Sequence, residues 1–267
     1  MCGLSIKDDN FSYILDINKL RLMKRKVLLL VFCALLSFPS VISAQEEFET
    51  DKFTTDGGEL EMTFIGHGTL MFSYNDLVIH IDPVSREADY STMPDADIIL
   101  ITHEHGDHLD HSAIRQIKKE NTVIICNESS SEGLDGCIVM ENGDSRRVSN
   151  ISVKAVPAYN IVHKRSSGEP FHPKGNGNGY LLTLGGKKVY VAGDTENIPE
   201  MKNFGDIDIA FLPVNLPYTM SVQMAADAAK MIKPGILYPY HFGSTEISEL
   251  AGLLDETDIE LRIRNLR

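Results

Sequence analysis

The sequence predicts a layered α/β protein built on large β-sheets. Short apolar stretches rich in β-branched residues recur along the chain, at 61–65, 77–81, 97–102, 122–126, 151–156, 180–184, 187–192, 207–212 and 235–240. Runs of this kind, bounded by turn residues, are typical of buried strands. Fewer stretches show helical spacing, at 111–119, 221–232 and 246–254. Strands therefore dominate early and helices are interspersed later, which is the pattern of a layered α/β fold.

The individual elements follow from their residues. The strands are runs of Val, Ile, Leu and aromatic residues separated by Gly, Pro, Asn and Asp. The helix at 111–119 carries Ile114 and Ile117 three positions apart, which places both side chains on one face. The longest predicted helix begins at Ser221, a favourable N-cap, and is stopped by Pro234, which cannot continue a helix.

Residues 23–44 have the three-part layout of a secretory signal peptide. A basic start at 24–26 precedes an apolar run at 27–36, and small residues follow. The apolar run has about ten residues, which is too short for a comfortable membrane span. We therefore expect an exported protein, periplasmic or extracellular, without stable membrane insertion; a retained N-terminal anchor is the alternative. Residues 1–22 are then an upstream extension, and 45–267 are expected to form a single domain.

The charge of the chain argues against generic nucleic-acid binding. The formal net charge is −13. Residues 1–44 hold six of the 25 Lys and Arg residues and three of the 38 Asp and Glu residues, so the net charge of 45–267 is about −16. Such a surface repels phosphate backbones. We expect a small molecule as the partner, and the sequence leaves the oligomeric state open.

Two of the four cysteines, Cys126 and Cys137, lie outside the predicted leader. Export permits a disulfide between them, but only geometry decides whether one forms. The alternative is two reduced thiols that are buried or half-buried. Neither belongs to a CxxC motif, so we do not interpret them as redox-active or metal-binding.

The stretch ITHEHGDHLDH at 101–111 holds four of the nine histidines of the chain. Alternate residues of an extended segment point the same way, so His103 and His105 can direct two imidazoles at one ion. Asp107 and His108 follow a glycine and are placed to face a neighbouring ion. Imidazole and carboxylate are ligands suited to zinc, and also to iron or manganese. The cluster therefore predicts a metal centre rather than a solvated charged turn.

The segment HEHGDH at 103–108 resembles the HxHxDH signature of the metallo-β-lactamase-fold superfamily of metallohydrolases. Upstream, IGHGTLMF at 65–72 and IHIDP at 79–83 resemble the strand-end motifs of its lactonase-like and general metal-dependent hydrolase branch. The resemblance covers most of 60–245. It implies a four-layer αββα sandwich, in which two mixed sheets pack face to face between helical layers and the metals lie at one sheet edge.

The resemblance also implies further ligands. The segment GDT at 193–195 follows a strand, as the bridging aspartate of the family does, so Asp194 is the candidate bridge. The segment PYHFG at 239–243 follows a C-terminal strand, where the family places its last histidine ligand, here His241. Asp107 and Asp194 are expected to offset the cation charge and to relay protons during catalysis.

One position departs from the family pattern. The strand at 151–156 leads into PAYN, so Asn160 stands where the family usually supplies a further histidine to the first metal. Four possibilities stay open: His172 reaches back, His163 reaches back, Asn160 binds through its carbonyl oxygen, or the ligand is missing. We include His172 in the predicted ligand set. We expect two zinc ions per chain, with one ion as the alternative, and manganese or iron as other metals.

The function predicted from these residues is metal-dependent hydrolysis of an ester, lactone, amide or phosphodiester bond. A metal ion lowers the pKa of bound water and polarises the group under attack, so no serine or cysteine nucleophile is required. Two alternatives stand beside it. The first is a non-catalytic binding protein that keeps the fold. The second is a di-iron oxidoreductase of the same fold, although such relatives typically carry a carboxylate where this chain has His105.

Other residues have weaker signals. His67, between two glycines at a strand end, is a catalytic candidate that orients substrate, with an exposed turn residue as the alternative. Asp82 is expected to orient a ligand through hydrogen bonds, or to be a turn residue. His80 alternates within a strand and is expected to pack in the core. His111 is expected at the surface, at the start of a helix.

Overall fold

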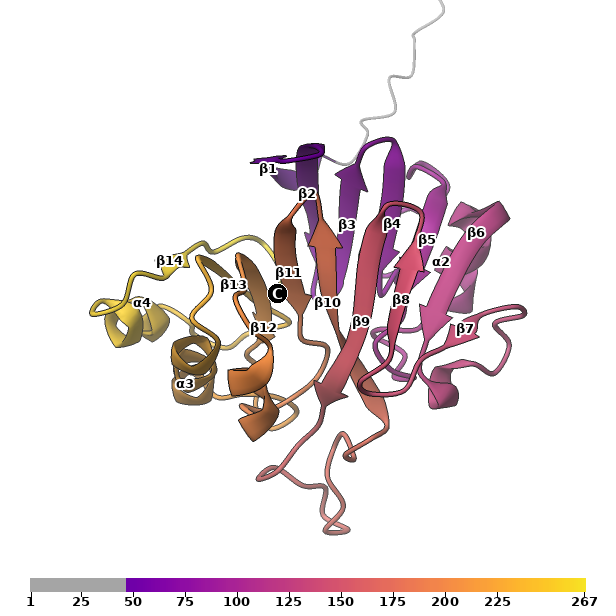
Figure 1. Cartoon of the computed structure of the whole chain (residues 1–267). Coiled ribbons are helices and arrows are strands. Elements are labelled where there is room, and N and C mark those ends of the chain that lie inside the picture. The colour runs from indigo at the N-terminus through magenta and orange to yellow at the C-terminus, as the bar shows by residue number, and fades with distance from the viewer. Residues whose placement is uncertain (1–46) are drawn as a thin grey trace, which may run out of the picture. The chain divides into compact units, whose positions relative to one another are not determined.

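Two seven-stranded sheets pack face to face in the computed structural model, which describes residues 47–267 (Figure 1). The predicted signal peptide at 23–44 and the upstream extension at 1–22 lie outside the described residues. The described residues form one compact unit. Among the described residues, no helix is both long enough and apolar enough to cross a membrane.

The first sheet contains the N-terminal strands in the order of the chain. Its members are β1 (Glu49–Thr55), β2 (Gly58–Gly66), β3 (Thr69–Tyr74), β4 (Leu77–Ile81), β5 (Ala96–Leu100), β6 (Lys118–Cys126) and β7 (Ile138–Val139). Strands β1 to β4 are antiparallel neighbours, whereas β4 to β7 run parallel. The sheet is therefore mixed, and the histidine-rich stretch follows β5 in its parallel half.

The second sheet has the same plan with the C-terminal strands. Its members, in spatial order, are β14 (Glu260–Leu261), β13 (Ile236–Tyr240), β12 (Ile209–Pro213), β11 (Lys187–Val191), β10 (Gly177–Leu184), β9 (Ile151–Ala158) and β8 (Ser145–Val148). Strands β8 to β11 are antiparallel and β11 to β14 are parallel. Each sheet therefore has an edge at which parallel strands end, and the loops that follow such carboxyl ends are where α/β proteins commonly bind ligands.

The main core lies between the two sheets. Phe64 and Phe72 from the first sheet meet Phe211 and Tyr238 from the second. The ring centroids of Phe64 and Tyr238 are 5.0 Å apart, and those of Phe72 and Phe211 are 5.9 Å apart. Burial of these apolar faces is the main force that joins the sheets.

Helices cover the outer faces of both sheets. On the first sheet, α2 (His111–Ile117) buries Ala113, Ile114 and Ile117. On the second sheet, α3 (Val222–Ile232) buries a face of four alanines and is capped by Ser221, whose Oγ accepts a hydrogen bond from the Met224 N–H. The short α4 (Glu249–Leu254) packs on α3. Two 3₁₀ turns, η1 (Glu128–Ser130) and η2 (Pro199–Asn203), complete the described elements.

The structure corrects some predicted boundaries. The helix predicted at 111–119 ends at Ile117, because Lys118 is already extended and begins β6. The helix predicted at 246–254 begins at Glu249. Strands β1, β3, β7, β8 and β14 were not among the predicted strands. Four of them are short or lack a continuous apolar run, whereas β3 overlaps the segment 65–72, which was interpreted only as a family motif.

Candidate metal centre

The histidine-rich stretch follows β5 and turns sharply before α2. The backbone N–H groups of His108 and Leu109 both donate to the carbonyl oxygen of His105, at 2.9 and 2.8 Å. Asp110 then caps α2, since its Oδ1 accepts a hydrogen bond from the Ser112 N–H at 2.7 Å. This turn divides the motif, with two of its ligand candidates on each side.

The first group of ligand candidates consists of His103, His105, His172 and Asp194. One nitrogen or carboxylate oxygen from each lies within 4.8 Å of all the others. His172 Nε2 is 3.2 Å from Asp194 Oδ2 and 3.2 Å from His105 Nδ1. The structure thus brings His172, not His163, into the position left open by Asn160.

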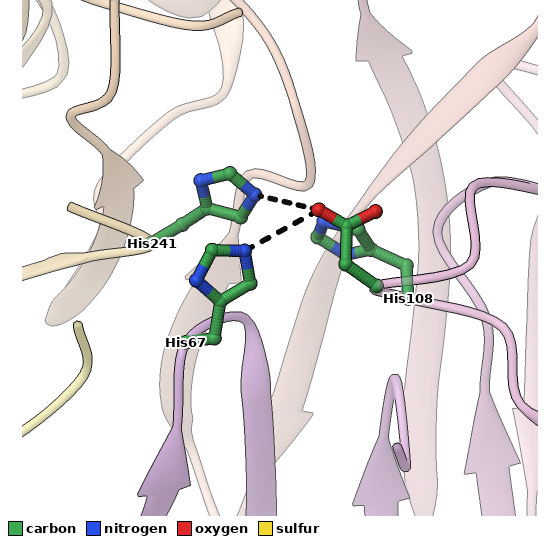
Figure 2. A group of neighbouring side chains, drawn as sticks. His67, His108 and His241 are labelled. Atoms are coloured by element: carbon green, nitrogen blue, oxygen red, sulfur yellow. Dashed lines mark hydrogen bonds and ion pairs between the residues drawn. The ribbon is translucent and has the colours of Figure 1, made fainter. Parts of the chain in front are cut away.

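The second group consists of His67, Asp107, His108 and His241, which satisfy the same distance condition. Figure 2 shows the rings of His67 and His241 side by side, and their Nε2 atoms lie 3.4 and 3.6 Å from Asp107 Oδ2. Their ring centroids are 3.7 Å apart. His67, which was predicted to orient substrate, therefore lies among the ligand candidates of this group.

Asp194 lies between the two groups. Its Oδ1 is 3.4 Å from His108 Nε2, and its Oδ2 is 3.5 Å from His241 Nε2 and 3.2 Å from His172 Nε2. Gly193 before it has a φ of +64°, and a Cβ there would lie 2.9 Å from the Asn178 carbonyl oxygen. The turn that presents Asp194 therefore requires glycine. This placement is the one predicted for a bridging carboxylate.

The unpaired atoms of the centre fit a metal. Buried polar atoms normally have hydrogen-bond partners. Among the described residues, His103 Nε2, His108 Nε2, His241 Nε2 and Asp194 Oδ1 are buried without one, and all belong to the two groups. Imidazole nitrogens and carboxylate oxygens are the donors that zinc, iron and manganese accept. The donor set and its unpaired atoms therefore suit cations.

The protonation states of the centre are consistent with cation binding. Burial lowers the pKa of His103 well below its usual value, so the ring is neutral. Burial raises the pKa of Asp107, but the nearby rings of His241 and His67 outweigh this, lower the pKa and keep the carboxylate ionised. Burial lowers the pKa of His108, but the carboxylate of Asp194 raises it well above its usual value. A metal ion must displace the His108 proton, which makes binding dependent on pH.

Asp82 orients two of the ligand candidates. It is fully buried at the end of β4. Its Oδ2 lies 2.8 Å from His108 Nδ1 and accepts the Thr102 hydroxyl at 2.6 Å. The same hydroxyl oxygen lies 3.0 Å from His103 Nδ1. Contacts on both Nδ1 atoms leave both Nε2 atoms directed at the centre, which matches the supporting role expected of Asp82.

Asn160 performs a similar task for His172. Its Oδ1 lies 2.7 Å from His172 Nδ1 and accepts the His172 backbone N–H at 2.9 Å. Its Nδ2 donates to Glu196 Oε1 at 3.1 Å and to the Tyr218 carbonyl oxygen at 2.9 Å, so the amide has a single orientation. His163 Nδ1 contacts Glu196 at 2.7 Å. Asn160 therefore supports a ligand candidate, and His163 helps to hold the loop.

Three residues at the centre have a strained backbone. His67, Asp82 and His241 have φ values of +49°, +46° and +51°, in the left-handed region that residues with a Cβ rarely adopt. Strain of this kind costs about 1–3 kcal/mol per residue and gathers at functional sites. The backbone N–H of His241 donates to the His67 carbonyl oxygen at 3.0 Å, which fixes the two loops to each other.

The centre opens into a cavity of about 350 Å³. Its wall includes five of the eight ligand candidates and four residues from two loops. The ligand candidates are His105, Asp107, His172, Asp194 and His241, and the loop residues are Arg165, Phe171, Asn215 and Tyr218. The Arg165 guanidinium lies over the Phe171 ring at 5.0 Å, and that ring meets Tyr218 edge-on at 5.1 Å.

Sequence reasoning missed Glu196, Phe171 and Asn215. Glu196 stands two positions after Asp194, but the backbone groups that it binds lie more than 30 positions away. The adjacency of Phe171 to His172 was the only local signal for that residue. Two other histidines lie as expected: His80 is fully buried in β4, and His111 begins α2 outside both ligand groups.

Comparisons with known proteins are consistent with this geometry. A family described as the beta-lactamase superfamily domain matches residues 61–241. A metal-dependent hydrolase from Pyrococcus furiosus is 33% identical over 199 residues, which cover 69% of this chain and 85% of that protein. One from Archaeoglobus fulgidus is 29% identical over 201 residues, which cover 71% of this chain and 86% of that protein.

Solved structures share the fold. A crystal structure from Parabacteroides distasonis, whose name places it among metal-dependent hydrolases, is 54% identical, with a TM-score of 0.80; the match covers 83% of this chain and all of that one. Igni18, a metallo hydrolase from Ignicoccus hospitalis, is 21% identical, with a TM-score of 0.60 and coverage of 78% and 95%. CmlA from Streptomyces venezuelae, a diiron β-hydroxylase, is 15% identical, with a TM-score of 0.59 and coverage of 77% and 53%. The predicted αββα sandwich is confirmed.

Proposed function

Because this chain belongs to the metallo-β-lactamase superfamily and is a metal-dependent hydrolase, we propose that it hydrolyses an ester, lactone, amide or phosphodiester bond of a small molecule, with zinc as its metal. The observation that carries the proposal is the pair of ligand groups that contact each other through Asp194 and open into one cavity. Two zinc ions per chain correspond to two groups of four donors; one ion, or manganese or iron, is the alternative.

A bound ion of this kind lowers the pKa of water toward neutrality and polarises the oxygen of the group under attack. The chain supplies the rest. Asp194, whose side chain is 3% exposed, contacts both ligand groups and fixes their positions relative to each other. Asp107, whose side chain is 36% exposed and lines the cavity, is the carboxylate that we assign to proton transfer toward the leaving group at Oδ2. Asp82 and Asn160 keep the imidazoles aligned.

Two alternatives receive less support. A binding protein that lost turnover has no reason to keep strained histidines and unpaired buried donor atoms around an open cavity. A di-iron oxidoreductase is suggested only by the likeness to CmlA, which at 15% identity concerns the fold alone. The hydrolase is therefore the function that these residues support best.

The test is metal content followed by activity. The purified protein should carry close to two zinc ions per chain by elemental mass spectrometry, and it should cleave at least one member of a panel of lactones, nitrophenyl esters and phosphodiesters. His103→Ala and Asp194→Ala should each reduce turnover at least about 100-fold while the fold is kept. Unchanged rates in both variants would mean that the catalytic centre lies elsewhere.

Export to the periplasm or the medium is also proposed, because 23–44 have the layout of a signal peptide. Fractionation of cells that express the full chain with a C-terminal tag tests this. A processed protein in the periplasm or medium supports export, and a full-length protein in the cytosol or membrane contradicts it.

A further inference from the structure

Exposed apolar side chains gather beside the metal centre. Among the described residues, five large hydrophobic side chains are highly exposed: Ile161 (46%), Val162 (66%), Leu216 (47%), Tyr218 (47%) and Ile263 (45%). The first four, here named the apolar rim, come from the loop after β9 and the loop after β12. The fifth lies in the C-terminal segment. Scattered exposure is ordinary in proteins, but a cluster next to a cavity marks a binding surface.

The two loops of the apolar rim are joined and held. Asn160 Nδ2 donates to the Tyr218 carbonyl oxygen at 2.9 Å, which connects one loop to the other. The buried Glu196 carboxylate accepts the backbone N–H groups of Ile161 and Val162, both at 2.7 Å. The fold therefore holds the backbone that presents Ile161, Val162 and Tyr218.

The apolar rim continues into the cavity of the metal centre. Tyr218 and Phe171 line the same cavity as Asp107 and His241. The edge-on contact of Phe171 with Tyr218 at 5.1 Å joins this member of the rim to the aromatic lining of the cavity. A ligand whose reacting group lies at the metal centre would therefore extend its remaining part over apolar surface.

We propose that the apolar rim binds an aliphatic chain of the substrate, so that the hydrolysed bond belongs to an amphiphilic molecule. This rests on the proposed hydrolase function. An aliphatic chain is favoured there because its contact with the rim removes apolar surface from water on both sides. A small polar substrate would leave the rim in water. The net charge of −13 repels anionic lipid surfaces, which makes a dispersed amphiphile the better occupant than a membrane.

Chain-length dependence tests the proposal. The metal-loaded protein is assayed with nitrophenyl esters from acetate to decanoate, and with acetate esters of alcohols of increasing length, all below their micelle concentrations. In at least one series, kcat/KM should rise about two- to fourfold per methylene. In the double variant Ile161→Ser, Val162→Ser, kcat/KM should become nearly independent of chain length. Ile263→Ser, a control of matched exposure, should keep the full rise.

A binding measurement separates this inference from the proposed function. Calorimetry with the carboxylates from acetate to decanoate should show affinity that increases with length, and the double variant should lose the increase. If the esters are hydrolysed without any dependence on chain length, and decanoate binds no tighter than acetate, the proposed role of the apolar rim is wrong while the proposed hydrolase function stands. If decanoate binds through the rim but no ester is turned over, the rim binds aliphatic chains as proposed and the proposed hydrolase function is contradicted. Rim-dependent sedimentation with phosphatidylcholine vesicles, without length dependence, also overturns the proposal.

Discussion

Asn160→Ala is the substitution that tests how the centre is held. Asn160 is 4% exposed and fixes His172 through two contacts on its Oδ1, at 2.7 Å to Nδ1 and 2.9 Å to the backbone nitrogen. Truncation leaves both His172 groups without an acceptor and lets the imidazole turn. Glu196 keeps three backbone donors, so the loop itself should remain folded.

The size of the effect follows from these contacts. Loss of a partner that orients a metal ligand typically costs about 10–100-fold in metal affinity or activity. Each buried donor left unpaired costs about 1–3 kcal/mol of folding free energy. We therefore expect a zinc dissociation constant that is about 10- to 100-fold higher. With two donors left unpaired, the melting temperature should be lower by roughly 4–24 °C.

The assay is competition for zinc with a chromogenic chelator, beside thermal unfolding of the same samples. Asn142→Ala is the control, because its Nδ2 makes partly buried hydrogen bonds, at 2.7 Å to Asn178 Oδ1 and 3.0 Å to the Gly177 carbonyl oxygen, but contacts no ligand candidate. The control should lose stability and keep its zinc affinity. If Asn160→Ala keeps wild-type zinc affinity while its stability falls like that of the control, the orienting role is refuted.

Four further predictions concern stability and chemistry. Burial lowers the pKa of His80 to about 4. As the pH falls, the unfolded chain therefore protonates this imidazole near pH 6.5 and the folded chain only near pH 4. The folded state should lose about 3 kcal/mol of stability between pH 6.5 and pH 4, and this stability is fully present above pH 6.5. His80→Leu should flatten that part of a denaturant-monitored pH profile, and an unchanged slope contradicts the assignment. Arg264 Nη2 lies 2.8 Å from each carboxylate oxygen of Asp51. Asp51→Asn weakens this ion pair and should lower the free energy of unfolding in urea by about 2 kcal/mol. A loss below about 0.5 kcal/mol would show that the ion pair does not stabilise the fold. Removal of zinc by a chelator should lower the free energy of unfolding of the wild type by about 2.7 kcal/mol if the ion was present at 100 times its dissociation constant, and the melting temperature should fall with it. An unshifted melting curve would mean that the fold does not bind zinc. The thiols of Cys126 and Cys137, with sulfurs 3.1 Å apart, should be converted to a disulfide by oxidised glutathione, with loss of two hydrogens by mass spectrometry; two alkylated thiols after that treatment would contradict this.

The fold was largely predictable because its signals are local. Apolar runs marked β4, β5, β11 and β13 within about two residues, and Ser221 with Pro234 marked α3. The unpredicted β8 (SRRV) is mostly exposed and is stabilised by pairing with β9, which no local pattern reveals. The end of α2 at Ile117 was misplaced because Lys118 and Lys119 are good helix formers that pairing with β5 makes extended.

The sequence by itself determined the chemistry of the centre. The spacing of His103, His105, Asp107 and His108 follows from an extended segment and a tight turn, and both are local properties of a few residues. Only the tertiary structure decided which distant groups complete it. It placed His172 at Asp194 and left His163 on Glu196, a choice between two loop histidines nine positions apart.

The tertiary structure also set His67 against His241, at 3.7 Å between ring centroids, although 174 positions separate them in the chain. The physical reason is that loop contacts follow from how the two sheets pack. That packing comes from apolar burial spread over the whole core, to which no single motif corresponds.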